Sequence, residues 1–219
     1  LIKFGSLYLK RENIKSYALD SEILLSNVLK KSREEILIEF DKQIDFETEK
    51  KFKKLIKRRS AKEPIAYILK HKEFWSKKFQ INHNILIPRP ETELLVEKLS
   101  SIYRGKNISI LDIGTGSGCI IISLLSELQN SYGVGVDVSK KAIEVASMNA
   151  NKLIPNRRIK FFKKSFLNIF DSKFDLIVSN PPYIKRRDIK NLNEDIKRFE
   201  PKIALDGGND GLDVIKKVI

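Results

Sequence analysis

Apolar residues recur at three- and four-residue intervals through about the first 70 residues, which is the spacing of one helix face. One stripe runs over residues 17–29, and Ser32 with Glu35 forms a capping box ahead of a second stripe. Pro64 stands where a short further helix would begin. The pattern predicts a helical N-terminal domain over residues 1–70.

A third stripe, over residues 46–59, combines an apolar side with a strongly basic side. The apolar side holds Phe52, Leu55 and Ile56. The basic side holds Lys50, Lys51, Lys53, Lys54, Lys57, Arg58 and Arg59. A run of this kind is usually a solvated helix face, and it can also be a contact surface for RNA or an acidic protein. The sequence leaves both interpretations open.

Between residues 71 and 91 the apolar spacing changes to short runs of β type. These runs lie on both sides of Asn82-His83-Asn84, which predicts a hairpin-like turn there. Pro88-Arg89-Pro90 then favours extended backbone, since each proline biases its predecessor away from helix. We expect residues 71–91 to form a β-hairpin-like connector between two domains.

Short β-branched runs and helical stretches alternate from Ile108 onward. The runs with strand character are ISILDI, YGVGVDV, RIKFF and FDLIVSN. Strands that alternate with helices are typical of a parallel sheet covered on both faces, because each crossover needs a helix. Residues 92–219 are therefore expected to form an α/β domain with a doubly wound sheet.

Composition restricts the class of protein. Of the 219 residues, 42% are hydrophobic and 32% are charged, which is enough apolar material for a globular core. The single cysteine, Cys119, and the two histidines, His71 and His83, make a poor set of metal ligands. No stretch approaches the roughly 20 apolar residues of a membrane span, and the first residues lack a signal-peptide layout. We expect a soluble protein of a reducing cytoplasm, with no metal site.

The charge balance is strongly basic. The chain carries 42 basic and 28 acidic residues, a formal net charge of +14, and its pI is about 9.7. Such a surface attracts nucleic acid or an acidic protein. A lysine-rich composition imposed by an AT-biased genome would give the same excess, so the charge alone selects no partner.

A glycine-rich turn follows the first expected strand and opens a helix at Cys119. It holds the candidate cofactor-binding residues Gly114, Thr115, Gly116, Ser117 and Gly118. Glycine lets a ligand approach the backbone where a side chain would clash. A dinucleotide fingerprint needs its third glycine at position 119, whereas here that glycine is Gly118. The pattern D-x-G-x-G-x-G resembles instead the S-adenosylmethionine loop of class I methyltransferases.

Two further candidates follow the next two strands. Asp137 ends the second strand, where a carboxylate can accept hydrogen bonds from ribose hydroxyls. The alternative is that Asp137 caps the next helix, a role for which Ser139 competes. After the third strand, many class I methyltransferases have an acidic residue that contacts adenine, and this chain has Ser165 there. Phe166 could stack on the adenine or belong to the core.

The tetrapeptide Asn180-Pro181-Pro182-Tyr183 follows the fourth strand, at the edge where an open α/β sheet binds its ligands. The Asn180 amide oxygen and the Pro181 carbonyl can accept both hydrogens of a planar NH₂ group, and Tyr183 can pack on its flat face. The two prolines fix the backbone that presents these acceptors. These four residues are the candidate catalytic group, and they would act by positioning the nucleophile.

The tetrapeptide resembles the one in amino-methyltransferases that act on adenine, guanine or a glutamine amide. Other segments resemble the HemK-type protein-glutamine N5-methyltransferases, namely residues 64–68 (PIAYI), 73–75 (EFW), 87–93 (IPRPETE) and 200–212 (EPKIALDGGNDGL). With the helical N-terminal domain, the resemblance covers nearly the whole chain. It implies a Rossmann-like class I fold and methyl transfer to the glutamine in the Gly-Gly-Gln loop of peptide-chain release factors.

The resemblance also assigns residues. It implies that S-adenosylmethionine is bound by Gly114–Gly118, Asp137, Phe166 and Asn180, and that the substrate glutamine is bound by residues 180–183. Phe166 departs from the family pattern, in which tryptophan is common. It also gives the basic N-terminal helices a use, which is to dock the release factor, and we expect the enzyme to be a monomer.

Three alternatives stay open. The glutamine could belong to ribosomal protein L3, or the same tetrapeptide could methylate a base of a nucleic acid. Class I methyltransferases continue through three further strands to a seven-stranded sheet, so we expect a methyltransferase domain that is incomplete at its C-terminus. A shortened chain that binds without catalysing is the third alternative.

Overall fold

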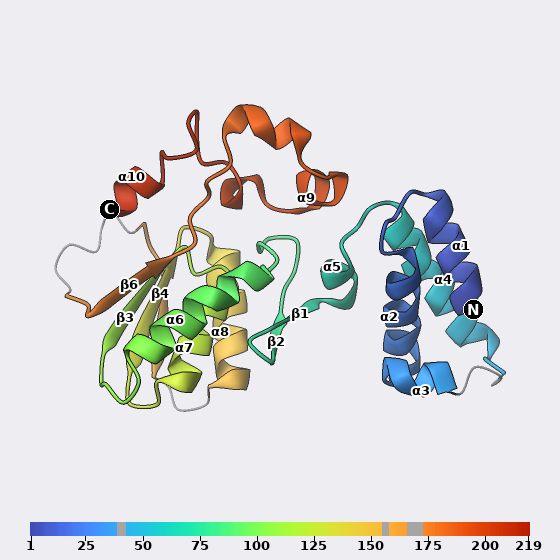
Figure 1. Cartoon of the computed structure of the whole chain (residues 1–219), viewed down its shortest axis with the longest axis horizontal. Coiled ribbons are helices and arrows are strands. Elements are labelled where there is room, and N and C mark those ends of the chain that lie inside the picture. The colour runs from blue at the N-terminus through green and yellow to red at the C-terminus, as the bar shows by residue number, and fades with distance from the viewer. Residues whose placement is uncertain (39–42, 155–157, 166–172) are drawn as a thin grey trace. The chain divides into compact units, whose positions relative to one another are not determined.

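The computed structural model describes residues 1–38, 43–154, 158–165 and 173–219. These residues form two compact units. The first unit consists of residues 1–70 with Glu194–Phe199, and the second of residues 71–193 with residues 200–219 (Figure 1).

The first unit is helical throughout its described part. Its helices are α1 (Ile2–Arg11), α2 (Tyr17–Leu29), α3 (Arg33–Ile38), α4 (Phe46–Ser60), α5 (Ile65–Leu69) and α9 (Glu194–Phe199). Helices α1–α5 enclose one apolar core, in which Leu9, Leu24 and Phe52 are fully buried. The expected capping box is present, since the Glu35 N–H donates to the Ser32 hydroxyl at 3.1 Å and the Ser32 N–H donates to the Glu35 carboxylate at 2.6 Å. The predicted helical N-terminal region is confirmed.

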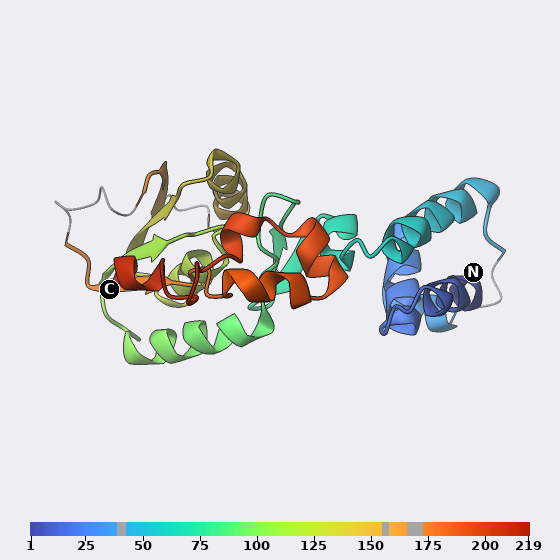
Figure 2. The ribbon, with the colours of Figure 1, turned by 90° about the horizontal axis from the view of Figure 1, so that it is seen from above.

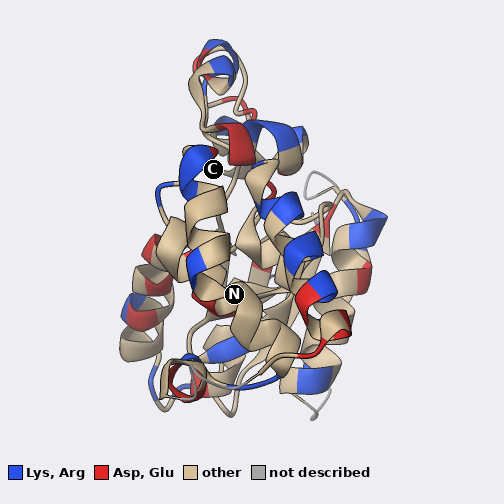
Figure 3. Ribbon diagram, turned by 90° about the vertical axis from the view of Figure 1, so that its right-hand side faces the viewer, with Lys and Arg blue, Asp and Glu red and all other residues tan. Residues whose placement is uncertain are grey.

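At the C-terminal end of α4, two arginines of the predicted basic side are not exposed to solvent as a stripe of this kind would be. Arg59 is buried, and its Nε donates to the Asp20 carboxylate of α2 at 2.6 Å. Arg58 is half-buried and pairs with Glu63. A charged side chain is buried only with a partner, so both arginines take part in the packing of the helical unit and do not extend the solvated stripe. The exposed basic residues of α4 are Lys50, Lys51, Lys53, Lys54 and Lys57, and the distribution of Lys and Arg over the ribbon can be followed in Figure 3.

In the described part of the second unit, parallel strands form a four-stranded sheet in the order β5-β4-β3-β6. The strands are β3 (Ser109–Ile113), β4 (Tyr132–Asp137), β5 (Ile159–Lys163) and β6 (Leu176–Ser179). All residues of the central strand β3 are buried, as expected for a strand covered on both faces. Ile113 pairs with Val136 on one side and with Ser179 on the other, so the carboxyl ends of β3, β4 and β6 lie together.

In the described residues, helices cover one face of this sheet fully and the other face only in part. On one face, α7 (Cys119–Glu127) and α8 (Lys140–Leu153) pack on the strands, and α6 (Glu93–Ile102) packs on α7 (Figures 1 and 2). On the other face, Val218 of α10 (Ile215–Val218) packs against a cluster that includes Leu111. The predicted α/β fold with a doubly wound, Rossmann-like sheet is confirmed.

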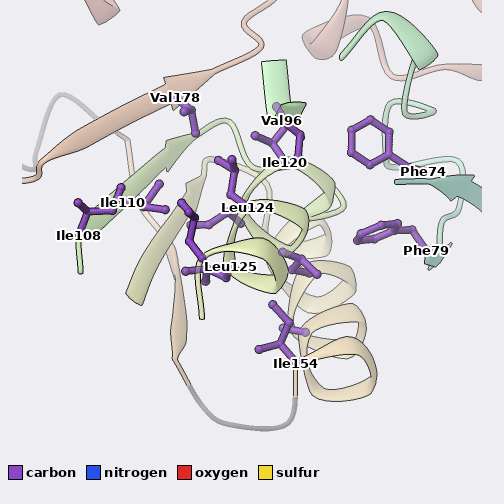
Figure 4. Close-up of a cluster of buried hydrophobic side chains, with 14 residues drawn as sticks. Phe74, Phe79, Val96, Ile108, Ile110, Ile120, Leu124, Leu125, Ile154 and Val178 are labelled. Atoms are coloured by element: carbon purple, nitrogen blue, oxygen red, sulfur yellow. The ribbon is translucent and has the colours of Figure 1, made fainter. Parts of the chain in front are cut away.

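The main apolar core of the second unit lies between the sheet and α7 (Figure 4). Ile110 of β3 and Leu124 of α7 are fully buried in it. Phe74 and Phe79 extend the same core from the connector, with their rings edge to face at a centroid distance of 6.0 Å. The connector therefore packs as part of the second unit.

The connector forms its hairpin at a different turn from the expected one. Strands β1 (His71–Phe74) and β2 (Lys77–Gln80) pair antiparallel around Trp75 and Ser76, whose φ angles are +51° and +52°. Two positive φ angles are typical of a type I′ turn, which matches the twist of the paired strands. The Trp75 N–H donates to the Glu93 carboxylate at 2.9 Å, and the Trp75 indole N–H donates to Glu127 at 2.8 Å. Contacts with α6 and α7 thus hold a turn that the turn propensities of its residues do not predict.

The prediction of a hairpin turn at residues 82–84 is wrong. The Asn84 N–H donates to the Asn82 side-chain oxygen at 2.9 Å, which makes this segment an Asx turn, but it joins no two strands.

No helix in the described ranges is long and apolar enough to cross a membrane. In the same part of the chain, no three His, Cys, Asp or Glu side chains come together as a metal-binding group.

Candidate active site

A pocket of about 300 Å³ lies at the carboxyl ends of β3, β4 and β6, within the second unit. An open parallel sheet binds its ligands at this edge. The sequence-predicted site residues that line it are Gly114, Gly116, Asp137, Asn180, Pro181 and Pro182. Three segments that follow three different strands therefore meet in one cavity.

The glycine loop bends over the end of β4. The N–H groups of Gly114 and Thr115 both donate to the Val136 carbonyl, at 2.9 and 3.0 Å, and the φ angles of Gly114 and Gly116 are +71° and +56°. A Cβ added to Gly114 would meet no described atom within 4 Å, and one added to Gly116 would meet only the Gly114 carbonyl oxygen, at 3.9 Å. These two glycines leave open space in the pocket, in which a ligand can lie against the backbone.

Gly118 has a different role in the same loop. Its φ is +79°, and an added Cβ would lie 2.8 Å from Ile122 and 3.4 Å from Ala146. The missing side chain leaves room for Ile122 of α7 and Ala146 of α8, so the loop packs closely against both helices. The side chains of Thr115 and Ser117 are buried. In the structure, Gly114 and Gly116 line the pocket, while the other three residues support the loop.

A buried amide joins the loop to the connector. Asn149 of α8 is fully buried. Its Nδ2 donates to the Ser117 carbonyl at 2.9 Å and to the Gln80 carbonyl at 3.0 Å, and its Oδ1 accepts from the Gln80 N–H at 2.7 Å. Sequence reasoning did not single out Asn149, because an asparagine within an amphipathic helix gives no sign of such distant partners.

Asp137 lies at the end of β4 with its carboxylate at the pocket. One oxygen accepts from the Gly116 N–H at 3.0 Å and the other from the Ser139 N–H at 2.9 Å. The cap of α8 is Ser139, whose hydroxyl accepts from the Ala142 N–H at 3.3 Å. Since each carboxylate oxygen can accept more than one hydrogen bond, Asp137 can also receive hydroxyl groups of a ligand.

Asp112, near the end of β3, is a buried acid that the sequence did not mark as a site residue. Burial raises the pKa of Asp112 to about 7, and the nearby charge of Asp137 acts in the same direction. The Thr115 hydroxyl donates to its carboxyl at 2.7 Å, which lowers the pKa in part. Asp112, which accepts a hydrogen bond from Thr115 of the glycine loop, therefore has a pKa near neutral pH.

The segment that follows β6 lines the pocket. The Ser179 hydroxyl donates to the Ile113 carbonyl at 2.9 Å, which ties the ends of β6 and β3 together. Asn180, Pro181 and Pro182 then line the pocket, whereas Tyr183 is 63% exposed. The segment thus places Asn180 and two rigid prolines at the cavity, while the ring of Tyr183 is exposed and is not among the lining residues.

Two distant segments complete the wall of the pocket. One is residues 84–86, and the other contributes Pro201, Ile203 and Ala204. An ion pair between Arg89 and Glu200 joins them at 2.6 Å, and the Ile87 N–H donates to the same carboxylate at 3.4 Å. The sequence motifs around Arg89 and Glu200 carried the family resemblance, but their spacing gave no sign that they meet here.

The region after β5 is only partly described. Lys164 lines the pocket, and its backbone N–H donates to the Asp137 carbonyl at 3.0 Å. Ser165 is half-buried beside it. Phe166 lies outside the described residues, so its place against an adenine ring stays a prediction.

Two protein families match this chain. Residues 1–69 match the PrmC N-terminal domain, and residues 90–199 match the methyltransferase small domain. The two matches together cover the helical region and most of the sheet region.

Curated relatives match over nearly the whole chain. A release factor glutamine methyltransferase of Buchnera aphidicola subsp. Acyrthosiphon pisum is 43% identical over 96% of this chain and 75% of its own length. One of Buchnera aphidicola subsp. Baizongia pistaciae is 40% identical over 100% of this chain and 78% of its own length. A third, of Geobacter sulfurreducens, is 38% identical over 97% of this chain and 74% of its own length. The chain thus spans about three quarters of the length of these relatives.

Solved structures show the same fold at low identity. The catalytic domain of hMettl16, in complex with a MAT2A 3'UTR hairpin, aligns with a TM-score of 0.53 at 18% identity, over 74% of this chain and 60% of that one. At this identity the likeness concerns the fold alone.

Proposed function

Because this chain belongs to the family of S-adenosylmethionine-dependent release factor glutamine methyltransferases, we propose that it methylates the glutamine of the Gly-Gly-Gln loop in a peptide-chain release factor. The atom that receives the methyl group is the side-chain amide nitrogen, N5. The names of the relatives favour neither ribosomal protein L3 nor a nucleic-acid base, and they do not favour a role without catalysis. We place the reaction in the cytoplasm, where release factors act, and expect a monomer.

The residues of the pocket fit the cofactor. Gly114 and Gly116 leave open backbone at the loop, and the Asp137 carboxylate can accept from both ribose hydroxyls. Phe166 keeps its proposed place at the adenine, and Asn180 its place between cofactor and substrate. When bound, S-adenosylmethionine supplies a methyl group that is already activated on a sulfonium sulfur.

Asn180 and Pro181 have the second task, which is to hold the substrate amide. The Asn180 side-chain oxygen and the Pro181 carbonyl would each accept one hydrogen of the glutamine NH₂ group. Pro182 fixes the backbone behind these acceptors, and Tyr183, which is exposed and directly follows the lining residues, would pack on the flat face of the amide. The nitrogen is thereby aimed at the methyl group.

This arrangement addresses the weakness of the nucleophile. An amide nitrogen reacts poorly because its lone pair is delocalised into the carbonyl. Acceptors on both hydrogens raise the electron density on nitrogen and hold it in line, which is catalysis by positioning. The bond from nitrogen to the methyl carbon would replace the bond from that carbon to sulfur, and the nitrogen held by Asn180 and Pro181 would then release one proton.

The helical unit is proposed to dock the release factor. Its exposed lysines on α4 form a positive surface that would attract an acidic protein over a distance. Residues 1–70 would act in docking, and residues 92–219 in catalysis, with residues 71–91 as the connector.

The observation that carries this function is the convergence of Gly114, Asp137 and Asn180 on one pocket. The test is transfer of labelled methyl from S-adenosylmethionine to a purified release factor. The matched control is the same release factor with its Gly-Gly-Gln glutamine replaced by alanine. Ribosomal protein L3 and RNA are offered in parallel.

Label on the release factor that disappears with the glutamine replacement is the expected result. Label on L3 or RNA at a higher rate would contradict the proposed substrate. No transfer to any of the three, with the cofactor bound normally, would favour the binding role without catalysis.

A further inference from the structure

The motif at residues 205–213 packs against the backbone of the catalytic segment. The Ile184 N–H donates to the Leu205 carbonyl at 3.1 Å, and the Gly207 N–H donates back to the Ile184 carbonyl at 2.9 Å. Ile184 and Asp206 form a parallel β-bridge between them. We call residues 205–213 the brace, because they hold the chain immediately after Tyr183.

Further contacts fix the brace to the same stretch. The Arg186 N–H donates to the Gly208 carbonyl at 2.8 Å, and the Arg186 Nε donates to the Asp206 carboxylate at 2.9 Å. The other Asp206 oxygen accepts from the Gly208 N–H at 2.9 Å. Within the brace, the Asp213 N–H donates to the Gly207 carbonyl at 2.9 Å. Backbone atoms on both sides are therefore held in register.

Gly207 lies against the catalytic segment with no room for a side chain. An added Cβ would lie 2.8 Å from the Pro182 carbonyl oxygen and 2.8 Å from the Tyr183 Cα. It would also lie 2.7 Å from the Gly211 carbonyl oxygen. All three are backbone atoms, which no rotamer change can move away.

Gly211 makes a second close approach. Its φ is +83°, and an added Cβ would lie 2.5 Å from the Tyr183 carbonyl oxygen. The two glycines thus contact consecutive residues of the catalytic segment. Any side chain at either position must displace the segment or the brace.

We propose that Gly207 and Gly211 are positioning residues for methyl transfer, which set the location of the Pro182–Tyr183 backbone and so aim the acceptors of Asn180 and Pro181. This inference rests on the proposed function. Because the two prolines make the segment stiff, a shift at Pro182 is passed on to Asn180 and is not absorbed by rotation within the segment. A misplacement of about 1 Å at a reacting group is enough to cost a large factor in rate.

The contacts of the brace predict which kinetic constant changes. The two glycines approach the catalytic segment, whereas the glycine loop and Asp137 are held by β4, α8 and the connector. The positioning of the amide should therefore suffer while cofactor affinity is kept. A brace that served folding alone would lower stability and leave the turnover of the folded enzyme unchanged.

The experiment compares Gly207→Ala and Gly211→Ala with Gly105→Ala in the full chain. Gly105 has a φ of +74°, but a Cβ there would meet no described atom within 4 Å. The Gly105 variant therefore has backbone strain similar to that of Gly211→Ala, without the steric contact. The readouts are the single-turnover rate on release factor, the affinity for S-adenosylhomocysteine by calorimetry, and the thermal unfolding curve.

We expect Gly207→Ala and Gly211→Ala to lower the single-turnover rate at least about tenfold. Their affinity for S-adenosylhomocysteine should stay within about twofold of the wild type, and Gly105→Ala should keep the wild-type rate. Rates within about twofold of the wild type in both brace variants would overturn the inference. A loss of affinity equal to the loss of rate would overturn it as well, since it would mean general damage to the fold.

Asp206→Asn gives a milder test if the alanine variants do not fold. It weakens the exposed pair with Arg186 and leaves the backbone contacts in place, so we expect a fall of a few fold in rate at unchanged cofactor affinity. An unchanged rate in this variant would overturn the inference in that case. If the wild type methylates a different planar nitrogen, and the brace variants lose rate on that substrate, the proposed function is wrong and the positioning role stands.

Discussion

Arg89 and Glu200, which are 111 positions apart in the sequence, form an ion pair at 2.6 Å behind the wall of the pocket. The Glu200 side chain is fully buried, and the Arg89 side chain is 30% exposed. The same carboxylate accepts from the Ile87 N–H. One buried acid therefore fastens the connector to the C-terminal segment, and both segments contribute residues to the pocket.

Glu200→Gln should destabilise the protein by about 2 kcal/mol, because it removes a charge-assisted bond from a buried site and leaves Arg89 without its counter-charge. Urea unfolding measures the free energy, and Arg89→Ala completes a double-mutant cycle. The two single effects should not add in the double variant. Additive effects would show that the pair is not coupled.

The convergence of the glycine loop, Asp137 and Asn180 could be predicted from the sequence for a simple reason. Each follows a run of strand character, and the carboxyl ends of parallel strands meet at one edge of a sheet. Local sequence patterns also predict the capping box at Ser32 and the helices of the first unit. These features depend on residues that are close in sequence.

The features that the sequence did not reveal depend on distant partners. The turn at Trp75 is held by Glu93 and Glu127, and Asn82 offered a stronger local turn signal. Arg59 looked like one more charge on a solvated face, because its partner Asp20 lies on another helix. The wall at residues 84–86 likewise depends on an acid near the other end of the chain.

Asp137→Ala should weaken binding of S-adenosylhomocysteine by about 1.5–3 kcal/mol, the range for a hydrogen bond to a charged group. Part of the loss comes from the Gly116 N–H, which loses its acceptor. Calorimetry measures the affinity. The control is Glu144→Ala, which removes an exposed carboxylate from α8 and should change nothing. Unchanged affinity in the Asp137 variant would refute its role at the ribose.

Asp112→Asn should flatten the dependence of stability on pH. Burial raises the pKa of Asp112 to about 7 in the folded protein, against 3.8 for the free side chain. An acid with a raised folded pKa stabilises the fold fully below its unfolded pKa, and this contribution is lost as pH rises from about 4 to about 7. The amide does not titrate, so this loss should be absent from the variant.

Urea unfolding at intervals between pH 4 and pH 8 measures the effect. Asp175→Asn is the control, since Ser109 hydrogen bonds lower the pKa of Asp175 and its contribution has the opposite sign. Parallel profiles for the wild type and Asp112→Asn would show that Asp112 is ionised in the fold at all these pH values.

Reversal of the charges of Lys50, Lys54 and Lys57 to Glu should slow association with the release factor by about tenfold and reduce its salt dependence. Affinity for S-adenosylhomocysteine should not change. The control reverses three exposed lysines of the second unit, namely Lys98, Lys152 and Lys160. Equal association rates for the wild type and the α4 variant would mean that the stripe is only a solvated face.

Asn180→Ala tests the amide-holding mechanism most directly. It removes one acceptor and leaves the substrate amide free to rotate, so the single-turnover rate should fall by roughly 100-fold, the scale for loss of one positioned group. Cofactor affinity should fall less, because Gly114, Gly116 and Asp137 remain.

Asn180→Asp keeps acceptor oxygens but adds a negative charge beside the sulfonium. This charge stabilises the ground state more than the transition state, because the positive charge of the sulfonium disperses during transfer. Its rate should therefore lie between the other two. Single-turnover rates at saturating cofactor decide the point, and an alanine variant within about threefold of the wild type would mean that Asn180 only shapes the turn after β6.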